Sequence, residues 1–293
     1  MMGPAPAGPL VRRLVVVGAG LIGGSLCAAA RARGLAARVV AVDREEAVRA
    51  EAARLGLADE VTGDPAAARD ADLVVLAVPV GLLAAAAAAV APHVDERAVV
   101  TDVGSVKEAV LAAVPPALLH PERFVPGHPI AGRERSGPGA ADAALFEGAL
   151  VILTPPPRTD PACVTAVRAL WAAAGARVLT MEAAEHDRIF AAVSHVPHVV
   201  AYALVGALLD LEAEQGPLVR YSAGGLRDFT RIAASDPTMW RDICLANREP
   251  ILKALARVRD VLGRLEVQIA AGDGDGLFAA FARAREVRRG MPS

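Results

Sequence analysis

The stretch LVVVGAGLIGGSL at residues 14–26 decides the fold. Its first four residues, Leu14–Val17, are all apolar and predict a strand that is buried on both faces. A helix is expected to follow over residues 21–33. The glycines between the two elements have the pattern G-x-G-x-x-G, which in a strand–turn–helix setting is typical of a dinucleotide-binding fold.

Each glycine of this turn has its own expected role. Gly18 allows the tight turn after the strand, Gly20 lets the backbone approach a pyrophosphate, and Gly23 lets the helix pack closely on the sheet. The first helical residues, Leu21 and Ile22, offer free N–H groups and the positive end of the helix dipole to phosphate. We therefore expect this turn to bind the phosphates of a dinucleotide.

The residue that follows the second strand indicates which dinucleotide is bound. Asp43 lies twenty residues after Gly23, where a carboxylate bonds the ribose hydroxyls and repels a 2′-phosphate. NAD is therefore expected as the cofactor rather than NADP. Arg44 is a complication, because a guanidinium accepts such a phosphate. Val78 and Asp102, at the ends of two further predicted strands, complete the expected cofactor-binding residues.

Short β-branched runs alternate with alanine-rich helical segments as far as Met181. The predicted strands are Leu14–Val17, Arg38–Val42, Leu73–Val78, Ala98–Thr101, Leu150–Leu153 and Arg177–Leu179. The predicted helices are Leu21–Arg33, Glu45–Leu55, Leu82–Val90 and Ala162–Ala173. Apolar strands separated by helices predict a parallel sheet that is covered on both faces.

Beyond Met181 the sequence indicates helices only. Apolar residues recur at alternating spacings of four and three in the last long helix: Ile251, Leu255, Val258, Leu262, Leu265 and Ile269. Such a seam packs against another helix, either within the chain or in a second copy. A homodimer through the helical domain is favoured, because one helical layer buries itself poorly.

The expected fold class is therefore α/β, a Rossmann-type doubly wound parallel sheet followed by an all-α helical domain. The expected boundaries are a flexible tail at residues 1–10, a dinucleotide-binding domain at residues 11–181 and a helical substrate and dimerisation domain at residues 182–293.

Composition excludes several other classes of protein. The net charge is −2 and aromatic residues make up only 3%, so neither nucleic acid nor an anionic membrane surface is an expected partner. The apolar run 73–91 is long enough to span a bilayer, but Pro79 and Gly81 interrupt it, and a strand followed by a helix is the simpler interpretation. Three widely separated cysteines fit a reducing compartment, so a cytoplasmic location is expected.

Four polar segments interrupt these apolar surroundings: TDVGSVK at 101–107, GHPIAG at 127–132, SHVPH at 194–198 and GGLRDFTR at 224–231. Pro129 keeps His128 extended, and Pro197 is expected to kink the helix that carries His195 and His198. Taken singly, each segment also has a structural explanation. His128 could be a loop histidine, the histidine pair lacks the further ligands that zinc needs, and exposed arginines often pair with nearby acids.

Together with GAGLIGGSL at 18–26, these segments and the longer block GGLRDFTRIAASDPTMWRDI at 224–243 resemble the prephenate/arogenate dehydrogenase family of tyrosine biosynthesis. The resemblance extends over nearly the whole chain. It implies an NAD-dependent enzyme that oxidatively decarboxylates prephenate to 4-hydroxyphenylpyruvate. Arogenate is the alternative substrate, with tyrosine as the direct product, and the sequence does not fix this choice.

The resemblance also implies roles for individual residues. His128 accepts the proton of the substrate's 4-hydroxyl, and Ser105 hydrogen-bonds the same hydroxyl. Arg231 binds a substrate carboxylate, for which a planar guanidinium is well shaped. The remaining residues expected around the substrate are His198 and His195 in the pocket and Glu134 and Arg227 at its entrance. No metal is expected at any of these positions.

Two other readings compete with this one. A β-hydroxyacid-type dehydrogenase shares the nucleotide fold and a helical second domain, but it generally uses a catalytic lysine on a helix, and no matching stretch is found. A nucleotide-binding protein without catalysis would have no need for His128, Ser105 and Arg231 together. An increase in NADH absorbance after prephenate and NAD are added separates the enzyme from the binding protein.

Overall fold

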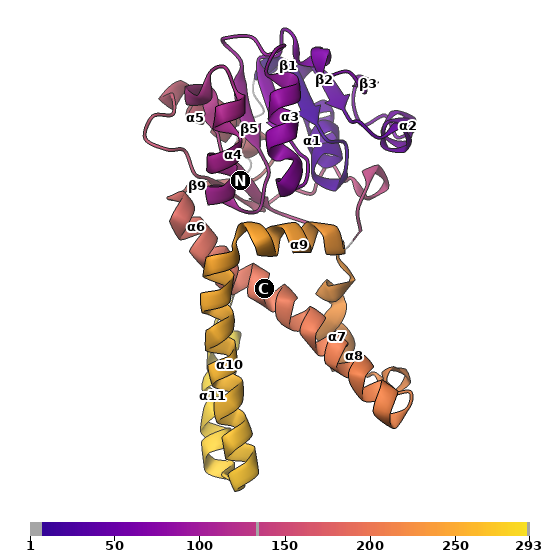
Figure 1. Ribbon diagram of the computed structural model, residues 1–293. Coiled ribbons are helices and arrows are strands. Elements are labelled where there is room, and N and C mark those ends of the chain that lie inside the picture. The colour runs from indigo at the N-terminus through magenta and orange to yellow at the C-terminus, as the bar shows by residue number, and fades with distance from the viewer. Residues whose placement is uncertain (1–7, 133–134, 292–293) are drawn as a thin grey trace.

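The computed structural model describes residues 8–132 and 135–291 of the chain. Figure 1 shows a sheet-containing part, which holds the N-terminal half of the chain, and a helical part that extends away from it as two arms. Of the predicted tail at residues 1–10, residues 1–7 lie outside the described ranges. The fold class predicted from the sequence is confirmed.

The larger sheet has six parallel strands in the order β3-β2-β1-β4-β5-β6. The strands are β1 Val11–Val17, β2 Ala36–Val42, β3 Glu60–Thr62, β4 Leu73–Leu76, β5 Val99–Asp102 and β6 Phe124–Val125. The chain winds outward in one direction from β1 through β2 and in the other direction from β4 through β5. Ligands of such sheets bind where the winding reverses, outside the carboxyl ends of the strands.

Side chains of β1 alternate between two separate cores. Leu14 and Val16 pack with residues of α1 and α5 on one face, whereas Val15 and Val17 pack with residues of α3 and α4 on the other face. The helices that cover the sheet are α1 Leu21–Ala32, α2 Glu46–Arg54, α3 Leu83–Val90, α4 Lys107–Ala113 and α5 Pro161–Ala173. The continuous apolar run of β1 follows from this burial on both faces.

A second, three-stranded sheet was not anticipated. It has the order β7-β8-β9, with β7 Gly127–Ile130 antiparallel to β8 Leu150–Leu153 and β8 parallel to β9 Arg177–Thr180. The sequence of β7 is GHPI, in which glycine and proline are poor strand formers. Proline is tolerated because β7 is an edge strand and therefore needs fewer ladder hydrogen bonds.

The helical part begins with one long helix that contains an irregular turn. A π-helical turn at Ala191–His195 separates α6 from α7, and Pro197 lies just beyond it. Proline has no N–H for the helical ladder, and irregular turns of this kind are a common response to it. The helices of this part are α6 Ala183–Phe190, α7 Val196–Gln215, α8 Gly224–Thr230, α9 Pro237–Ala246, α10 Arg248–Ala271 and α11 Gly274–Arg289.

Glycines and an aspartate mark several helix ends. Gly34 and Gly56, which follow α1 and α2, have φ angles of 62° and 64°, which glycine adopts without strain. Helix α7 ends directly before Gly216, and the Asp236 carboxylate caps α9 by accepting from the Met239 N–H at 2.7 Å.

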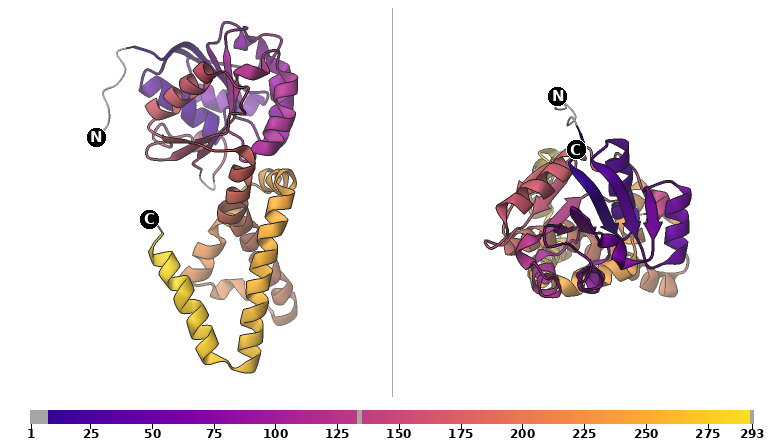
Figure 2. Two further views of the ribbon diagram at one scale, coloured as in Figure 1. Left: turned by 90° about the vertical axis from the view of Figure 1, so that its left-hand side faces the viewer. Right: turned by 90° about the horizontal axis from the view of Figure 1, so that it is seen from above.

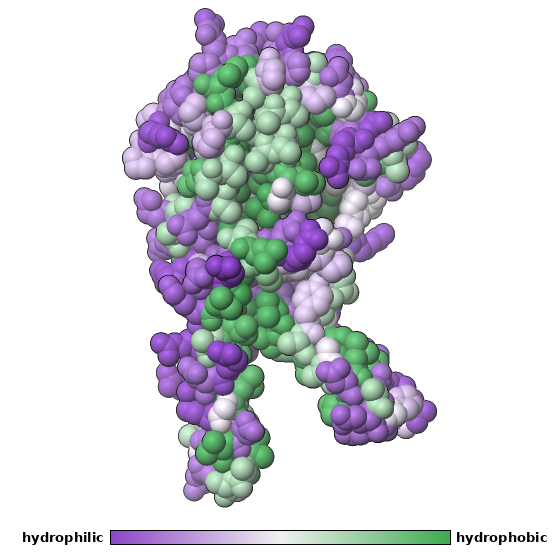
Figure 3. All heavy atoms as spheres, in the orientation of Figure 1, coloured by the Kyte–Doolittle hydropathy of each residue, from purple (hydrophilic) through white to green (hydrophobic). Residues whose placement is uncertain are grey.

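Apolar surface remains uncovered on the helical arms. In Figure 2, α10 and α11 extend far from the sheet as a helical hairpin, and Figure 3 shows hydrophobic surface on both arms. Ile251 of the predicted seam is only 5% exposed and packs beside α6 and α7, but Leu262 and Ile269 are 57% and 66% exposed. The seam is therefore covered at its start and open farther along the helix.

The helical run Ala183–Gln215 is long and apolar enough to cross a membrane, judged among the described residues by length and composition alone, which is weak evidence. The apolar run 73–91 that raised this question in the sequence instead contains β4, buried in the sheet, and α3, packed on one of its faces.

Candidate active site

The turn from Gly18 to Gly23, hereafter the glycine turn, connects β1 to α1 and has little room for side chains. Gly18 has a φ angle of 100°, and a Cβ atom there would overlap the carbonyl oxygen of Ala77. A Cβ atom at Gly23 would overlap the carbonyl oxygen of Gly18. A Cβ atom at Gly20 would meet nothing within 4 Å. Gly18 and Gly23 are thus required for packing, whereas Gly20 faces open space that a ligand can approach.

A cleft of about 480 Å³ lies beside the glycine turn, at the carboxyl ends of the central strands. Its lining includes five residues that the sequence predicts to bind cofactor: Gly18, Gly20, Asp43, Arg44 and Val78. Leu21, Ile22 and Gly23 form the start of α1 behind it. Small side chains of α3, among them Ala85, Ala86 and Ala89, form much of the opposite wall. A flat aromatic base and a pyrophosphate fit these surroundings.

Asp43 is positioned by backbone hydrogen bonds. Its Oδ2 accepts from the Ala19 N–H at 2.9 Å and its Oδ1 accepts from the Glu45 N–H at 3.0 Å. The carboxylate therefore stands against the glycine turn, where a ribose would lie. Arg44 is largely exposed, and its Nε lies 3.0 Å from Glu45 Oε1.

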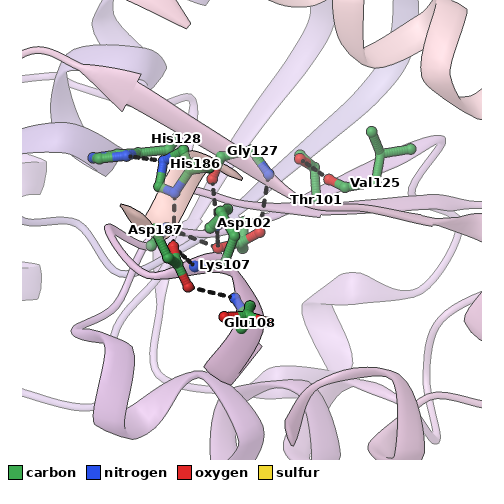
Figure 4. Close-up of polar contacts among 10 residues, drawn as sticks. Thr101, Asp102, Lys107, Glu108, Val125, Gly127, His128, His186 and Asp187 are labelled. Carbon is green, nitrogen blue, oxygen red and sulfur yellow. Dashed lines mark hydrogen bonds and ion pairs between the residues drawn. The ribbon is translucent and has the colours of Figure 1, made fainter. Parts of the chain in front are cut away.

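A buried polar cluster lies at the same edge of the sheet, beyond β4 (Figure 4). Lys107 Nζ donates to Asp102 Oδ2 and to the Gly127 carbonyl oxygen, each at 2.6 Å. Asp102 Oδ1 accepts from the Gly127 N–H at 3.1 Å. Lys107 and Asp102 are fully buried, and burial lowers the pKa of Lys107 while Asp102 opposes that shift. These contacts fix the backbone of β7 directly before His128.

His128 is the first member of a hydrogen-bonded series of three side chains (Figure 4). Its Nδ1 lies 2.8 Å from His186 Nε2, and His186 Nδ1 lies 2.7 Å from Asp187 Oδ1. His186 and Asp187 come from the first helix of the helical part, whereas His128 comes from β7. The ring of Phe190 stacks on His186 with centroids 4.5 Å apart and meets the edge of His128 at 5.1 Å.

Two further histidines continue this group. His195 Nδ1 lies 3.0 Å from Asn247 Nδ2, which also donates to the backbone carbonyl of Asp187 at 2.8 Å. His198 Nδ1 lies 2.8 Å from the Ser194 carbonyl, and its ring stacks on Trp240 with centroids 3.6 Å apart. His128, His186, His195 and His198 are called the histidine cluster below.

Burial keeps the histidine cluster uncharged near neutral pH. It lowers the pKa of His128 well below 6.5, and the neighbouring His186, Lys107 and His195 lower it further. Burial lowers the pKa of His195 to about 4, and it also lowers the pKa values of His186 and His198. A neutral imidazole has a bare ring nitrogen that accepts a proton.

Not every predicted residue has a contact with this cluster. Ser105 lies in the loop between β5 and α4, and within the described part of the chain its hydroxyl makes no hydrogen bond. Arg227 in α8 and Arg231, which directly follows α8, are exposed on the arm that α7 and α8 form, not on the arm of α10 and α11 (Figure 1). Glu134 lies outside the described residues.

Sequence reasoning missed His186, Asp187, Asn247 and Trp240 as members of this site. The pair His186–Asp187 had no local signal, because it stands within the polar run of residues 185–188. Asn247 had no signal beyond its place between two helices. Lys107 was part of a quoted motif, but its burial could not be inferred without β7.

A dinucleotide cleft and a buried, neutral histidine at one edge of a parallel sheet define a nicotinamide-dependent oxidoreductase. The chain belongs to the prephenate dehydrogenase family. Residues 26–180 match the family model described as prephenate dehydrogenase, nucleotide-binding domain, and residues 182–283 match the one described as prephenate dehydrogenase, dimerization domain.

Individual relatives agree with this assignment. The chain is 39% identical over 279 residues to the cyclohexadienyl dehydrogenase of Zymomonas mobilis, with 94% of this chain and 95% of that protein aligned. It is 34% identical to the prephenate dehydrogenase of Bacillus subtilis, with 95% and 76% aligned. The crystal structure of Aquifex aeolicus prephenate dehydrogenase in complex with hydroxyphenyl propionate and NAD+ has a TM-score of 0.89, at 36% identity, and covers 95% of this chain and 97% of that one.

The cofactor prediction is therefore confirmed, and the protein is an NAD-dependent oxidoreductase. Membership of this family also decides against the β-hydroxyacid and purely nucleotide-binding readings of the sequence.

Proposed function

We propose that this protein catalyses the NAD-dependent oxidative decarboxylation of prephenate to 4-hydroxyphenylpyruvate, a step of tyrosine biosynthesis. The observation that carries the proposal is the place of His128. Its ring is buried and neutral, and the backbone before it is fixed to Asp102 at the edge of the sheet that holds the cofactor cleft. A fixed neutral base beside a nicotinamide site is what oxidation of an alcohol requires.

In the proposed reaction the cofactor and two side chains have separate roles. NAD, when bound, supplies the acceptor for the hydride that leaves the substrate's C4. His128 accepts the proton of the 4-hydroxyl as its oxygen gains carbonyl character, and Ser105 hydrogen-bonds that oxygen. Loss of carbon dioxide makes the ring aromatic, and His128 returns the proton to the phenolate oxygen. The protein mainly positions the groups, because aromatisation provides much of the driving force.

Cationic and polar side chains bind the two carboxylates of the substrate. Arg231 is proposed to bind one of them directly, because dianionic substrates need cationic partners. His198 and His195 line the pocket in this scheme, and Arg227 lies at its entrance. For Glu134, which is outside the described residues, the role at the entrance rests on the family resemblance alone. On the cofactor side, the proposed contacts are Gly18, Gly20, Leu21, Ile22, Gly23, Asp43, Arg44 and Val78. Asp102, which the sequence also suggested, is fully buried and binds Lys107 and the Gly127 N–H instead.

The proposal extends to the organisation of the chain. Residues 11–181 would form the cofactor-binding domain and residues 182–293 the domain that completes the substrate pocket and forms a homodimer. The exposed apolar side chains of α10 and α11, such as Leu262, Ile269 and Phe281, support this association. Sedimentation velocity should then give a particle of twice the 30.1 kDa chain mass. The free state of all three cysteines fits a cytoplasmic enzyme.

Arogenate is the second candidate substrate. The crystal structure of Synechocystis arogenate dehydrogenase has a TM-score of 0.77 and 28% identity to this chain, with 94% of this chain and 99% of that one covered. Arogenate differs from prephenate in carrying an ammonium group where prephenate has a keto group, and Glu134 would favour that ammonium.

Steady-state kinetics with both substrates and both nicotinamide cofactors test the proposal. Formation of NADH is followed by absorbance with prephenate or arogenate as substrate, and the NAD and NADP reactions are compared. We expect a higher kcat/KM with prephenate than with arogenate and a lower KM for NAD than for NADP. Turnover of arogenate alone would reassign the substrate, and no turnover of either compound would overturn the proposal.

A further inference from the structure

The Asp187 carboxylate is held from two sides. Its Oδ1 accepts from the Lys107 N–H and its Oδ2 from the Glu108 N–H, each at 2.8 Å. Both donors belong to the first turn of α4, whose N–H groups have no partner within the helix. Asp187 therefore joins a helix of the sheet-containing part to the histidine cluster of the helical part.

These contacts fix the proton positions on the two linked rings. A carboxylate accepts hydrogen bonds and donates none, so the proton between Asp187 and His186 must be carried by His186 Nδ1. Burial lowers the pKa of His186 and leaves the ring with one proton, so its Nε2 is a bare acceptor. The hydrogen bond between the rings then requires the proton of His128 to be on Nδ1. The Nε2 atom of His128 is left with a free lone pair.

We propose that His186 and Asp187 are positioning residues that hold His128 in its Nδ1–H tautomer and so make Nε2 the atom that accepts the substrate proton. This inference rests on the proposed function of His128 and concerns how that residue is prepared for it. It assigns His186 and Asp187 no contact with the substrate.

The same hydrogen bonds accommodate the charge that forms during turnover. When the substrate O–H bond breaks, its electron pair forms the C=O bond and its proton binds His128 Nε2. The C4–H bond breaks in the same step, and its electron pair leaves as the hydride that NAD would accept. The Nδ1 proton of His128 then shifts toward His186 Nε2, which places positive charge beside Asp187. When the C–CO₂ bond breaks, its electron pair enters the ring, the oxygen becomes a phenolate and the proton returns to it. The chain neither gains nor loses a proton over one cycle.

The surroundings of His186 and Asp187 exclude water from the rings over which the positive charge moves. His186 and Asp187 are almost completely buried, and Phe190 covers one face of the His186 ring. The other titratable groups facing the two linked rings are Asp102 on β5, Lys107 on α4 and His195 in the π-helical turn. Asp102 already binds Lys107, which leaves Asp187 as the carboxylate in direct contact with the rings.

The first test measures the tautomers directly and needs no substrate. In protein labelled with ¹⁵N-histidine, long-range ¹H–¹⁵N correlation spectra at pH 7.5 report which ring nitrogen carries the proton. We expect Nδ1–H for both His128 and His186, although the Nε2–H form is the commoner one for a solvent-exposed neutral histidine side chain. Assignment comes from the loss of one signal set in His128→Asn and in His186→Gln. An Nε2–H form of His128 would overturn the inference.

The second test reverses the direction of the hydrogen bonds. In Asp187→Asn one carboxylate oxygen becomes an NH₂ group. With that group in the place of Oδ1, it donates to His186 Nδ1, which drives both rings to the other tautomer and places a proton on His128 Nε2. An asparagine in the matching position of a Ser–His–Asp triad has this effect and lowers kcat by about 10⁴. We expect kcat to fall by about 10²-fold or more, with KM for prephenate and Kd for NAD within about twofold of the parent values.

The pH profile separates this role from a purely structural one. Asp187 raises the pKa of His186 against the larger, lowering effect of burial. Without the carboxylate the linked rings hold a proton less well, so the acid limb of kcat should move to lower pH in Asp187→Asn. If the substitution only disturbed the fold, kcat would fall while the acid limb of its pH profile stayed at the same pH. That result would contradict the inference.

Matched variants control for damage to the fold. Asp160 also caps a helix, accepting from the Ala162 N–H at 2.8 Å, so Asp160→Asn makes the same substitution at another cap without touching the cluster. It should leave kcat and its pH profile unchanged. His186→Gln keeps an acceptor toward His128 and a donor toward Asp187, whereas His186→Leu keeps neither. The glutamine variant should therefore retain more kcat than the leucine variant, and equal activities would count against the proposal.

Failure of this inference is distinguishable from failure of the proposed function. If the parent protein oxidises prephenate but Asp187→Asn matches it in kcat and pH profile, the function holds and the inference falls. If the parent protein does not turn over prephenate while the spectra show both Nδ1–H tautomers, the proposed function falls and the tautomer assignment remains.

Discussion

The glycine turn and the histidine cluster lie at the same edge of one sheet, but they are built in different ways. The glycine turn is a single stretch of six residues that acts through its backbone and through the absence of side chains. The histidine cluster takes its rings from β7, from α6 and from the turn and helix that follow, and a buried asparagine between α9 and α10 supports it. Local sequence therefore determines the first region, whereas long-range packing determines the second.

The largest expected effect comes from removing the base of the histidine cluster. His128→Asn should lower kcat by about 10²-fold or more, the scale of a lost general base, while Kd for NAD stays within about twofold because the glycine turn is untouched. Steady-state kinetics and NAD titration measure the two quantities. His120→Asn is the control, since His120 is exposed and its Nδ1 lies 3.2 Å from Glu122 Oε1, away from the cluster. Unchanged turnover in His128→Asn would remove the residue from the mechanism.

The second prediction compares two positions within the glycine turn, Gly23 and Gly20. Gly23→Ala should destabilise the fold by about 3 kcal/mol, because its Cβ would overlap a backbone oxygen that cannot move freely. Gly20→Ala should melt like the parent protein but bind NAD at least about tenfold more weakly, because its methyl group enters the space next to the pyrophosphate. Thermal unfolding and NAD titration on both variants measure this. Equal melting temperatures for the two variants would refute the distinction.

The third prediction concerns the pH dependence of stability, which the histidine cluster should dominate. The folded pKa values of its members lie below 6.5, so between pH 6.5 and about 4 the unfolded chain binds protons that the folded chain does not. Stability should therefore fall as pH falls through this window, by about 3 kcal/mol from His195 alone.

Urea unfolding at a series of pH values between 7.5 and 4.5 measures this loss. The slope should be shallower in His195→Gln, which removes one of the groups that take up a proton on unfolding. A stability that stays constant from pH 7 to pH 5 would mean that the cluster is hydrated rather than buried.

The smallest expected effect is on substrate affinity. Arg231→Ala should raise KM for prephenate about tenfold, the scale of a lost charged hydrogen bond, and leave NAD binding unchanged. Arg220→Ala is the matched control, because Arg220 lies on the same arm and contacts Tyr221. A KM for Arg231→Ala within about twofold of the parent value would count against the assignment.

What could be predicted from the sequence follows the same division. The glycine turn, Asp43 and the strands that are apolar on both faces could be recognised because each is encoded by neighbouring residues. Strand β8 was predicted with the bounds that the structure shows. Strand β7 was missed because two of its four residues, Gly127 and Pro129, are poor strand formers, and its strand conformation depends on pairing with β8.

The candidate site divides similarly. His128, His195 and His198 stood out in the sequence because they lie in polar motifs within apolar surroundings. Asp187 and Asn247 did not, because their importance comes from partners 80 and 52 residues away in the chain, Lys107 and His195. No local pattern encodes such contacts.

The burial of Lys107 has a practical consequence. The sequence contains only two lysines, Lys107 and Lys253, and the second is exposed on α10. An amine-selective acylating reagent reaches Lys253 in the folded protein. It does not reach Lys107, whose ammonium is buried between Asp102 and the Gly127 carbonyl oxygen. The slow appearance of a second acyl group on the lysines, read by peptide mass spectrometry, would therefore count how often the molecule opens at its catalytic edge.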